Sequence, residues 1–430
     1  MMEMNETLNK QNIICVLPYN ISEVQLIFYH DFSWWLEGFG SVLIGSLGIV
    51  FNATTISVLL GSELAASFFN WLLVCLALFD SLFLLNGILE AFRTYLGSTI
   101  LHNYVFVAFL FPFRSVVLCC SIYMTVILAL ERYNALANPT SHQGSNFRGG
   151  QNSLRTYFIH HWARVLKYVG PIILLSSLFY IPKLMELHVV KIPEECIRNG
   201  TLVNCSHSYS VISTELRNNN HYILWYINVT NLVVTTIIPL VSLTYLNFNI
   251  YLKFKKYIQR QPSAKSNTGQ IHGQIRKREK YMIQQTTILF VIVFLFALSH
   301  VLRIILNIEE FISLEASNNA REEGCDWLKF WTVIAAPVSH FLLQINCSIN
   351  FFIYCFFNKS FRDALVSKLT MIINSLKFGR ETDGTIDEVP HAPTGTASHR
   401  HKHEIQGSTN EDIEDAVELK DINPAIEEEV

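Results

Sequence analysis

Charged residues are scarce in this chain of 430 residues: Asp, Glu, Lys and Arg make up 16% of it, while hydrophobic residues make up 50%. A soluble chain of this length rarely has so little charge, so the composition favours a polytopic helical membrane protein. Residues 1–10 lack the basic stretch and the following apolar segment of a secretory signal. We therefore expect no cleaved signal peptide, and we expect the first span to act as its own anchor.

The sequence also lacks the residue patterns of an enzyme. It has no nucleophile paired with a base, no phosphate-binding loop and no metal-ligating cluster. It has neither an internal repeat nor a pair of glycine-interrupted spans, which would favour a transporter. We expect a protein that is not an enzyme, with no metal site, no cofactor and no nucleic-acid partner.

Long apolar runs are what the chain does have, and seven of them are long enough to cross a bilayer. We place the spans at Trp35–Leu60, Phe68–Phe92, Tyr104–Leu136, Ala163–Leu187, Tyr222–Phe254, Met282–Phe311 and Leu328–Phe357. The fold class is therefore an all-α membrane protein, a seven-transmembrane helix bundle over residues 35–357.

Three further segments complete the predicted organisation. Residues 1–34 form an N-terminal arm. Residues 358–378 combine apolar and basic side chains at helical spacing, which suits a short amphipathic helix on the membrane surface. Residues 379–430 are polar and acidic, which is typical of a disordered tail.

Lysine and arginine set the orientation. The segments after the third and fifth spans are basic, whereas the N-terminal arm and residues 309–326 are rich in acids. We expect a multi-pass plasma-membrane protein with its N-terminus extracellular and its C-terminus cytosolic. Glycosylation sequons on the expected outside begin at Asn5, Asn20, Asn199 and Asn204.

Disulfides persist on the outside, so the four cysteines expected there are disulfide candidates: Cys15, Cys196, Cys205 and Cys325. Three pairings are open to them. The combination of Cys196–Cys205 with Cys15–Cys325 is favoured, and a free Cys15 is the alternative.

Glu131, Arg132 and Tyr133 lie at the cytosolic end of the third span. A carboxylate beside a guanidinium at a membrane boundary is costly unless the two pair or meet water. Such a pair suits a lock that opens when the helix moves. The alternative is charge that snorkels to the interface.

Asp80 lies at mid-membrane depth in the second span, where a carboxylate indicates a functional site. Residues at similar depth that could bond to it are Asn52, Ser121, Asn346 and Asn350. Asn346, Asn350 and Tyr354 follow i, i+4, i+8 and share one helix face. The oxygen atoms would suit a hydrated Na⁺ or a proton; the alternative is a network that only joins helices.

The outer half of the bundle carries more charge than a lipid-facing surface allows. We expect a polar ligand cavity open to the outside. Its predicted lining is Glu90, Arg93, Arg114, Glu186, His300, Arg303 and His340. The alternatives are pairs such as Glu90 with Arg114 that neutralise each other without a ligand, and a His300 that is simply packed and hydrogen-bonded.

Together these residues resemble the rhodopsin-like (class A) G-protein-coupled receptors. The resemblance is carried by Asn52, Asp80, Glu131–Tyr133, Pro239 and Asn350–Tyr354, in the family's order and spacing. Within that family the chain looks most like the invertebrate FMRFamide-type neuropeptide receptors, through short stretches such as Ile181–Glu186, Thr214–Asn218 and Asn346–Cys355.

The resemblance implies a receptor for an extracellular, amidated, FMRFamide-like neuropeptide that activates a heterotrimeric G protein. Arg132 would leave Glu131 to contact the G protein, with Tyr354 holding the open form. A phosphorylated tail would recruit arrestin. A receptor of the same fold for a non-peptide ligand, a non-signalling seven-span protein and an ion-coupled transporter remain alternatives.

The chain departs from the family's pattern in several places. The usual Trp is absent from the fourth span as placed, and the usual Cys is absent near Val107 at the outer end of the third. His300 and Leu302 replace a Trp and a Pro of the sixth span. Arg114 lies at the level where amine receptors carry Asp, which disfavours a monoamine ligand.

Overall fold

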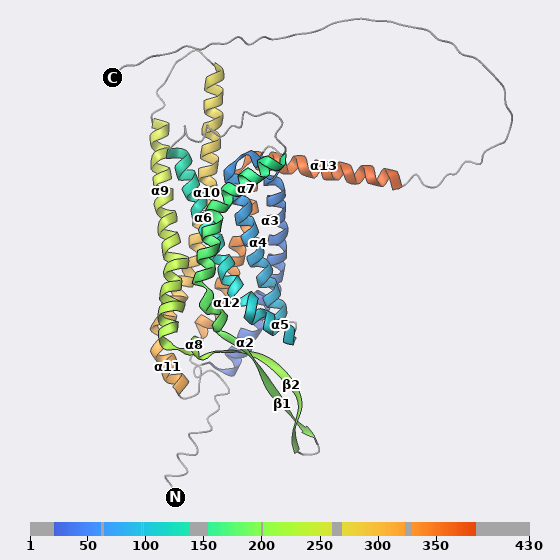
Figure 1. Cartoon of the computed structure of the whole chain (residues 1–430), viewed down its shortest axis with the longest axis vertical. Helices are drawn as coiled ribbons and strands as arrows, with labels where there is room; N and C mark the ends of the chain where they lie inside the picture. Colours follow the sequence, from blue (N-terminus) through green and yellow to red (C-terminus); the bar gives the residue numbers. More distant parts are fainter. Residues whose placement is uncertain are drawn as a thin grey trace, which may run out of the picture. The chain divides into compact units, whose positions relative to one another are not determined.

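The computed structural model describes residues 21–61, 64–95, 97, 99–137, 154–198, 201–259, 269–322 and 329–383. In these residues, seven helical runs are long and apolar enough to cross a membrane, and they lie side by side in one bundle (Figure 1). The predicted seven-transmembrane fold is confirmed. The bundle belongs to the compact unit Met1–Ile373, and a second unit comprises Asn374–Val430.

The first helical run starts earlier than the predicted Trp35. It consists of α2 (Glu23–Ser33), a π-helical segment (Trp34–Gly40) and α3 (Ser41–Leu59). Ser22 caps α2, because its side chain accepts the Gln25 backbone N–H while the Gln25 side chain accepts that of Ser22. This capping box begins a helix inside the segment that was expected to be an arm. The second run is α4 (Phe68–Tyr95).

The third run consists of α5 (Ile100–Val105), a π-helical segment (Phe106–Leu110) and α6 (Phe111–Ala137). The fourth is α7 (Leu154–Phe179), followed by a 3₁₀ turn (Ile181–Met185). Pro182 lies in this 3₁₀ turn after the helix, and Pro171 is the proline inside it.

The fourth helix does contain a tryptophan. Trp162 lies within α7, and its ring meets that of Trp71 edge-on at 5.5 Å. The departure inferred from the sequence was therefore wrong. The apolar run that defined the span begins at Ala163, whereas the helix extends into polar residues before it.

A β-hairpin connects the fourth and fifth runs and was not predicted. Strands β1 (Leu187–Arg198) and β2 (Thr201–Ser213) pair antiparallel, from Leu187 opposite Ser213 to Arg198 opposite Thr201. The Asn103 amide of α5 donates to the Tyr209 carbonyl oxygen at 2.9 Å and ties the hairpin to the bundle. Helix α8 (Glu215–Asn218) follows it.

The fifth run has two π-helical segments, Tyr222–Thr230 and Val233–Ile237, before α9 (Ile238–Gln259). Pro239 lies just after the second segment, and because it lacks a backbone N–H it removes one hydrogen bond of the helix next to the widened turns. The remaining helices are α10 (Gly269–Ile312), α11 (Leu314–Glu322), α12 (Phe330–Phe357) and α13 (Lys359–Asp383).

Helix α13 begins where the amphipathic helix was predicted. Phe361 near its start is fully buried in the same apolar cluster as Tyr354 and Met124. Below we call the end of the bundle with the β-hairpin the hairpin end, and the end where α13 begins the α13 end (Figure 1).

Candidate functional site

Asp80 is 1% exposed, and two neighbouring spans hydrogen-bond to its carboxylate. The Ser121 hydroxyl on α6 donates to Oδ1 at 2.5 Å, and the Asn350 amide on α12 donates to Oδ2 at 2.8 Å. Each oxygen therefore has the partner that a buried polar atom needs. One carboxyl joins the second, third and seventh spans.

The other two residues assigned to this network have different roles. The Asn52 amide donates to the Cys347 carbonyl oxygen at 3.1 Å, which joins the first span to the seventh. Asn346 is half-buried, and no hydrogen bond from it to Asp80 occurs in the described part of the chain. The carboxylate, hydroxyl and amide oxygens present are of the kind that a hard cation prefers.

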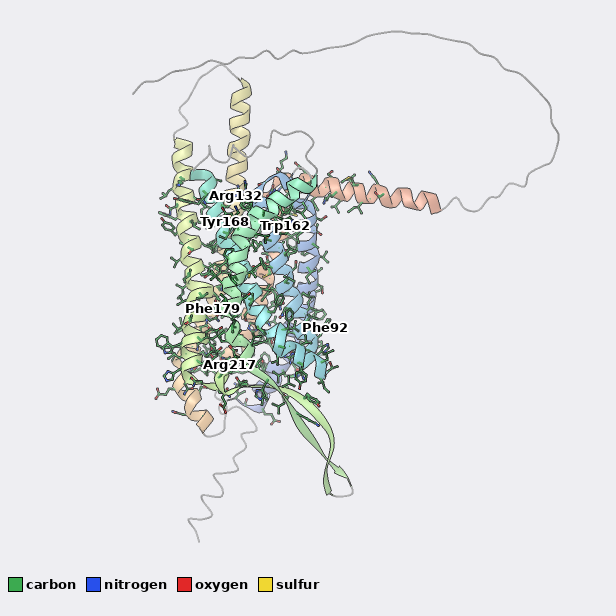
Figure 2. The ribbon with its side chains drawn as sticks, in the orientation of Figure 1. Phe92, Arg132, Trp162, Tyr168, Phe179 and Arg217 are labelled. Atoms are coloured by element: carbon green, nitrogen blue, oxygen red, sulfur yellow. The ribbon has the colours of Figure 1, made fainter. Side chains whose placement is uncertain are left out.

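Arg132 lies at the α13 end of the bundle (Figure 2). Its guanidinium stacks over the Phe69 ring, with 3.4 Å between the Cζ atom and the ring centroid. The Lys253 ammonium lies over the neighbouring Tyr133 ring, with 3.8 Å between Nζ and the ring centroid. Cation–π contacts of this kind are favourable, most of all where water is excluded. They connect the third span to the second through Phe69 and to the fifth through Lys253.

Tyr354 is 2% exposed, at the end of α12 that leads into α13. The centroid of the Tyr354 ring lies 5.7 Å from that of Phe361. The Tyr354 hydroxyl is buried and has no hydrogen-bond partner among the described residues. An unsatisfied buried hydroxyl is costly, so this conformation of Tyr354 gains its stability from packing.

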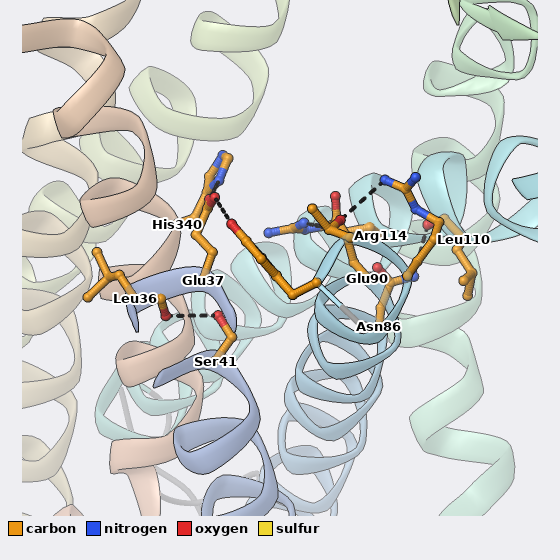
Figure 3. Close-up of polar contacts among 11 residues, drawn as sticks. Leu36, Glu37, Ser41, Asn86, Glu90, Leu110, Arg114 and His340 are labelled. Atoms are coloured by element: carbon orange, nitrogen blue, oxygen red, sulfur yellow. Dashed lines mark hydrogen bonds and ion pairs between the residues drawn. The ribbon is translucent and has the colours of Figure 1, made fainter. Parts of the chain in front are cut away.

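At the hairpin end, Glu90 of α4 forms an ion pair with Arg114 of α6 (Figure 3). Arg93, one turn further along α4, places its guanidinium over the Phe106 ring at 3.8 Å. These three charges, predicted to line an open cavity, are therefore engaged by the protein itself.

Glu37 is a functional-site candidate that the sequence analysis missed. Its Oε1 lies 3.0 Å from His340 Nδ1 (Figure 3). The Ser33 hydroxyl donates to Glu37 Oε2 at 3.1 Å. The Tyr95 hydroxyl lies 3.5 Å from the same oxygen. The rule that singled out Asp80, a carboxylate within an apolar run, would also have found Glu37.

Glu186 lies in a buried ionic cluster at the base of the hairpin and is 1% exposed. The Tyr222 hydroxyl donates to its Oε1 at 2.9 Å. Lys183 Nζ lies 3.6 Å from Oε2 and Arg217 Nε 3.9 Å from it. The cluster joins the end of the fourth span to α8 and to the start of the fifth span.

His300 is 1% exposed on α10 and packs its ring on Phe296, with the centroids 4.1 Å apart. Its Nδ1 lies 3.5 Å from the Thr236 hydroxyl of the fifth span. These contacts match the packed, hydrogen-bonded alternative for His300. Arg303, three residues further along the same helix, is half-buried.

A cavity of about 600 Å³ opens at the hairpin end, lined by α2, the end of β2, α8, the start of the fifth span, α10, α11 and α12. It is lined by other residues than the seven that were predicted. Leu26 and Tyr29 contribute from α2, Arg217 from α8, Glu309 from α10 and Lys329 from the start of α12. The observed cavity therefore lies at the hairpin ends of the first, sixth and seventh spans.

The proposed disulfides and glycosylation sites are not described in full. Cys15, Cys325, Asn5, Asn20 and Asn199 lie outside the described residues. Cys196, Asn204 and Cys205 lie on the hairpin, where the backbone register puts Cys196 opposite Val203 and Asn204 opposite Glu195; their side chains are outside the description.

The fold and the site are those of a seven-helix membrane receptor. Seven helices have membrane length, three of them share the buried Asp80 carboxyl, and Arg132 lies at one end of the third. The family described as serpentine type 7TM GPCR chemoreceptor Srw matches residues 40–371. The chain belongs to this family of G-protein-coupled receptors, and it is a multi-pass membrane protein. The resemblance read from the sequence is confirmed.

A relative with an assigned ligand is the FMRFamide receptor of Drosophila melanogaster. The chain is 26% identical to it over 360 residues, which is 81% of this chain. The match spans 56% of the length of that receptor. Both the family and this relative are receptors rather than enzymes.

Proposed function

We propose that the chain is a plasma-membrane receptor that binds an extracellular, amidated, FMRFamide-like peptide and activates a heterotrimeric G protein. The observation that carries the proposal is the similarity to a receptor for FMRFamide over 81% of the chain. The cavity of about 600 Å³ at the hairpin end supports it, because ligand pockets of about 300–1,000 Å³ are usual.

In this proposal the hairpin end faces outside and the α13 end faces the cytosol. The basic residues that flank the fifth and sixth spans support this orientation, since lysine and arginine collect on the cytosolic side. A glycosylated N-terminal arm and at least one outer disulfide would follow from it, using the sequons and cysteines named above.

The signal passes as a population shift between two arrangements of the bundle. In the resting form, Arg132 packs on Phe69 and Tyr354 packs on Phe361. In the active form, α10 and the end of the fifth span swing outward, Arg132 contacts the G protein, and the Tyr354 hydroxyl finds a polar partner in the opened space.

Two further partners belong to the same proposal. A hydrated Na⁺ would bind near Asp80, where oxygen donors gather, and would favour the resting form. Arrestin would bind the phosphorylated tail, whose hydroxyl residues between Thr385 and Ser398 lie outside the described residues.

The test is to express the chain in cells, confirm that it reaches the surface, and measure G-protein activation by FMRFamide and other amidated peptides, with monoamines as controls. We expect activation by a peptide at nanomolar concentration and none by monoamines. Activation by a small non-peptide compound alone would overturn the peptide assignment. A silent surface-expressed protein would overturn the signalling assignment.

A further inference from the structure

Two residues that line the cavity at the hairpin end form an ion pair with each other. Lys329, the residue before α12, places its ammonium on the Glu309 carboxylate of α10. The Glu309 side chain is 17% exposed and the Lys329 side chain is 38% exposed, and both residues line the cavity. The pair therefore ties the outer ends of the sixth and seventh spans together where a ligand can reach it.

The surroundings of this pair are mixed in chemistry. Glu310 lies next to Glu309, so α10 presents two carboxylates to the cavity. Leu306 and Ile223 are apolar lining residues, and Tyr29 contributes an aromatic ring from α2. A ligand that suits this lining has a cationic group beside an apolar or aromatic side chain.

The other cation of the lining is engaged elsewhere. Arg217 points to the buried Glu186, with 3.9 Å between Nε and Oε2. Among the lining residues that the structure describes, Glu309 and Lys329 form a partly exposed ion pair that a ligand can reach. Because it is partly exposed, water and salt already weaken it, so replacing its cation costs little.

We propose that Glu309 binds the cationic residue of the ligand in exchange for Lys329, and that this exchange frees the outer end of α10 from α12. The inference rests on the proposed peptide-receptor function and names the residue that reads the ligand's charge. A guanidinium is the stronger competitor, because it donates two parallel hydrogen bonds to a carboxylate, whereas an ammonium acts as a compact point charge.

The exchange acts at a distance because α10 is one continuous helix of 44 residues, Gly269–Ile312. Between its two ends it contacts the fifth span through His300, whose Nδ1 lies 3.5 Å from the Thr236 hydroxyl. A change at the outer end can therefore be carried as a rigid-body movement to the opposite end of the helix. Ligand charge and G-protein activation are linked through this one element.

Binding of FMRFamide is compared with binding of its analogue that has citrulline in place of arginine, because citrulline keeps the shape of arginine and loses its charge. The comparison tests whether Glu309 recognises the positive charge of the ligand. We expect the wild type to bind the citrulline peptide about tenfold more weakly, the size typical of a lost hydrogen bond to a charged group. In Glu309→Gln the difference should nearly vanish. The control is Glu315→Gln, an exposed carboxylate on α11 that does not line the cavity. A full tenfold preference in Glu309→Gln overturns the inference.

Variants of Lys329 test the exchange itself. Lys329→Met removes the internal competitor and should raise both FMRFamide affinity and ligand-free G-protein turnover several-fold, whereas Lys329→Arg should lower the affinity. If the wild type binds neither peptide, the proposed ligand is wrong. The exchange is then judged on ligand-free turnover alone, and an unchanged turnover in Lys329→Met overturns it.

Discussion

The contact between the first and seventh spans depends on the absence of a side chain at Gly48. A Cβ atom added there would lie 2.2 Å from the Ser348 hydroxyl oxygen, 2.9 Å from its Cβ and 2.6 Å from Leu84 Cδ1. The Ser348 hydroxyl cannot turn away freely, because it donates to the Gln344 carbonyl oxygen at 2.8 Å. Gly48→Ala must therefore shift α12 away from α3.

Two opposing terms set the size of the effect. Overpacking a close contact costs about 1–3 kcal/mol, and the strained or lost Ser348 hydrogen bond adds about 1 kcal/mol. Alanine is favoured over glycine inside a helix by about 1 kcal/mol. We therefore expect Gly48→Ala to destabilise the receptor by about 1–3 kcal/mol.

The assay is the midpoint of thermal unfolding of the purified receptor in detergent. We expect a lower midpoint for Gly48→Ala and recovery of at least half the loss in Gly48→Ala/Ser348→Gly, which removes two of the three clashing atoms. Ser46→Ala on the exposed side of α3 is the matched control and should leave the midpoint unchanged or slightly raised. A Gly48→Ala receptor as stable as the wild type would refute the close approach of these two spans.

Three further predictions concern single polar groups. Tyr354→Phe removes a buried hydroxyl without a partner in the described chain, so it should raise the unfolding midpoint while lowering peptide-driven G-protein turnover; a fall in both would contradict the two-state role of Tyr354. Tyr222→Phe removes the hydrogen bond to Glu186 and should destabilise by about 1.5–3 kcal/mol, as read from thermal unfolding; no change would mean that the cluster is held by its cations alone. Ser121→Ala should lower the midpoint by weakening the hold on Asp80, and an unchanged midpoint would mean that Asn350 suffices.

The seven spans were predictable because each is an apolar run of membrane length, a property of local sequence. Helix ends were less predictable, because caps and polar turns extend helices beyond the apolar run. Ser22 begins the first helix before Trp35, and α7 includes Trp162. The β-hairpin was missed because strand pairing depends on a partner segment rather than on local hydropathy.

In the candidate site, too, local features were predictable from the sequence and contacts between distant segments were less so. Depth in the membrane and helical spacing gave four candidate partners for Asp80. Ser121 and Asn350 bond to it, whereas Asn52 bonds to the Cys347 carbonyl oxygen and Asn346, within the described residues, does not reach it.

Depth grouped the charges at the hairpin end of the bundle and suggested the pair of Glu90 with Arg114, which the structure contains. The partners of Glu186 could not be predicted, because they depend on how the segment after the fourth span folds back. Glu186 was assigned to an open cavity, whereas Tyr222, Lys183 and Arg217 bury it. The observed cavity combines residues from several helices and from the end of β2, and no sequence pattern connects these segments.

In the proposed function, this chain couples an extracellular peptide to a G protein through the α13 end of the bundle. The most direct measurement compares FMRFamide binding and FMRFamide-driven G-protein turnover for purified wild type and Arg132→Ala. We expect the wild type to show both. We expect Arg132→Ala to keep binding but to lose at least nine-tenths of the turnover, on the order of 1.4 kcal/mol or more of the interaction with the G protein. Full turnover by Arg132→Ala would contradict the role of Arg132, and a wild type that binds the peptide without turnover would contradict the signalling claim itself.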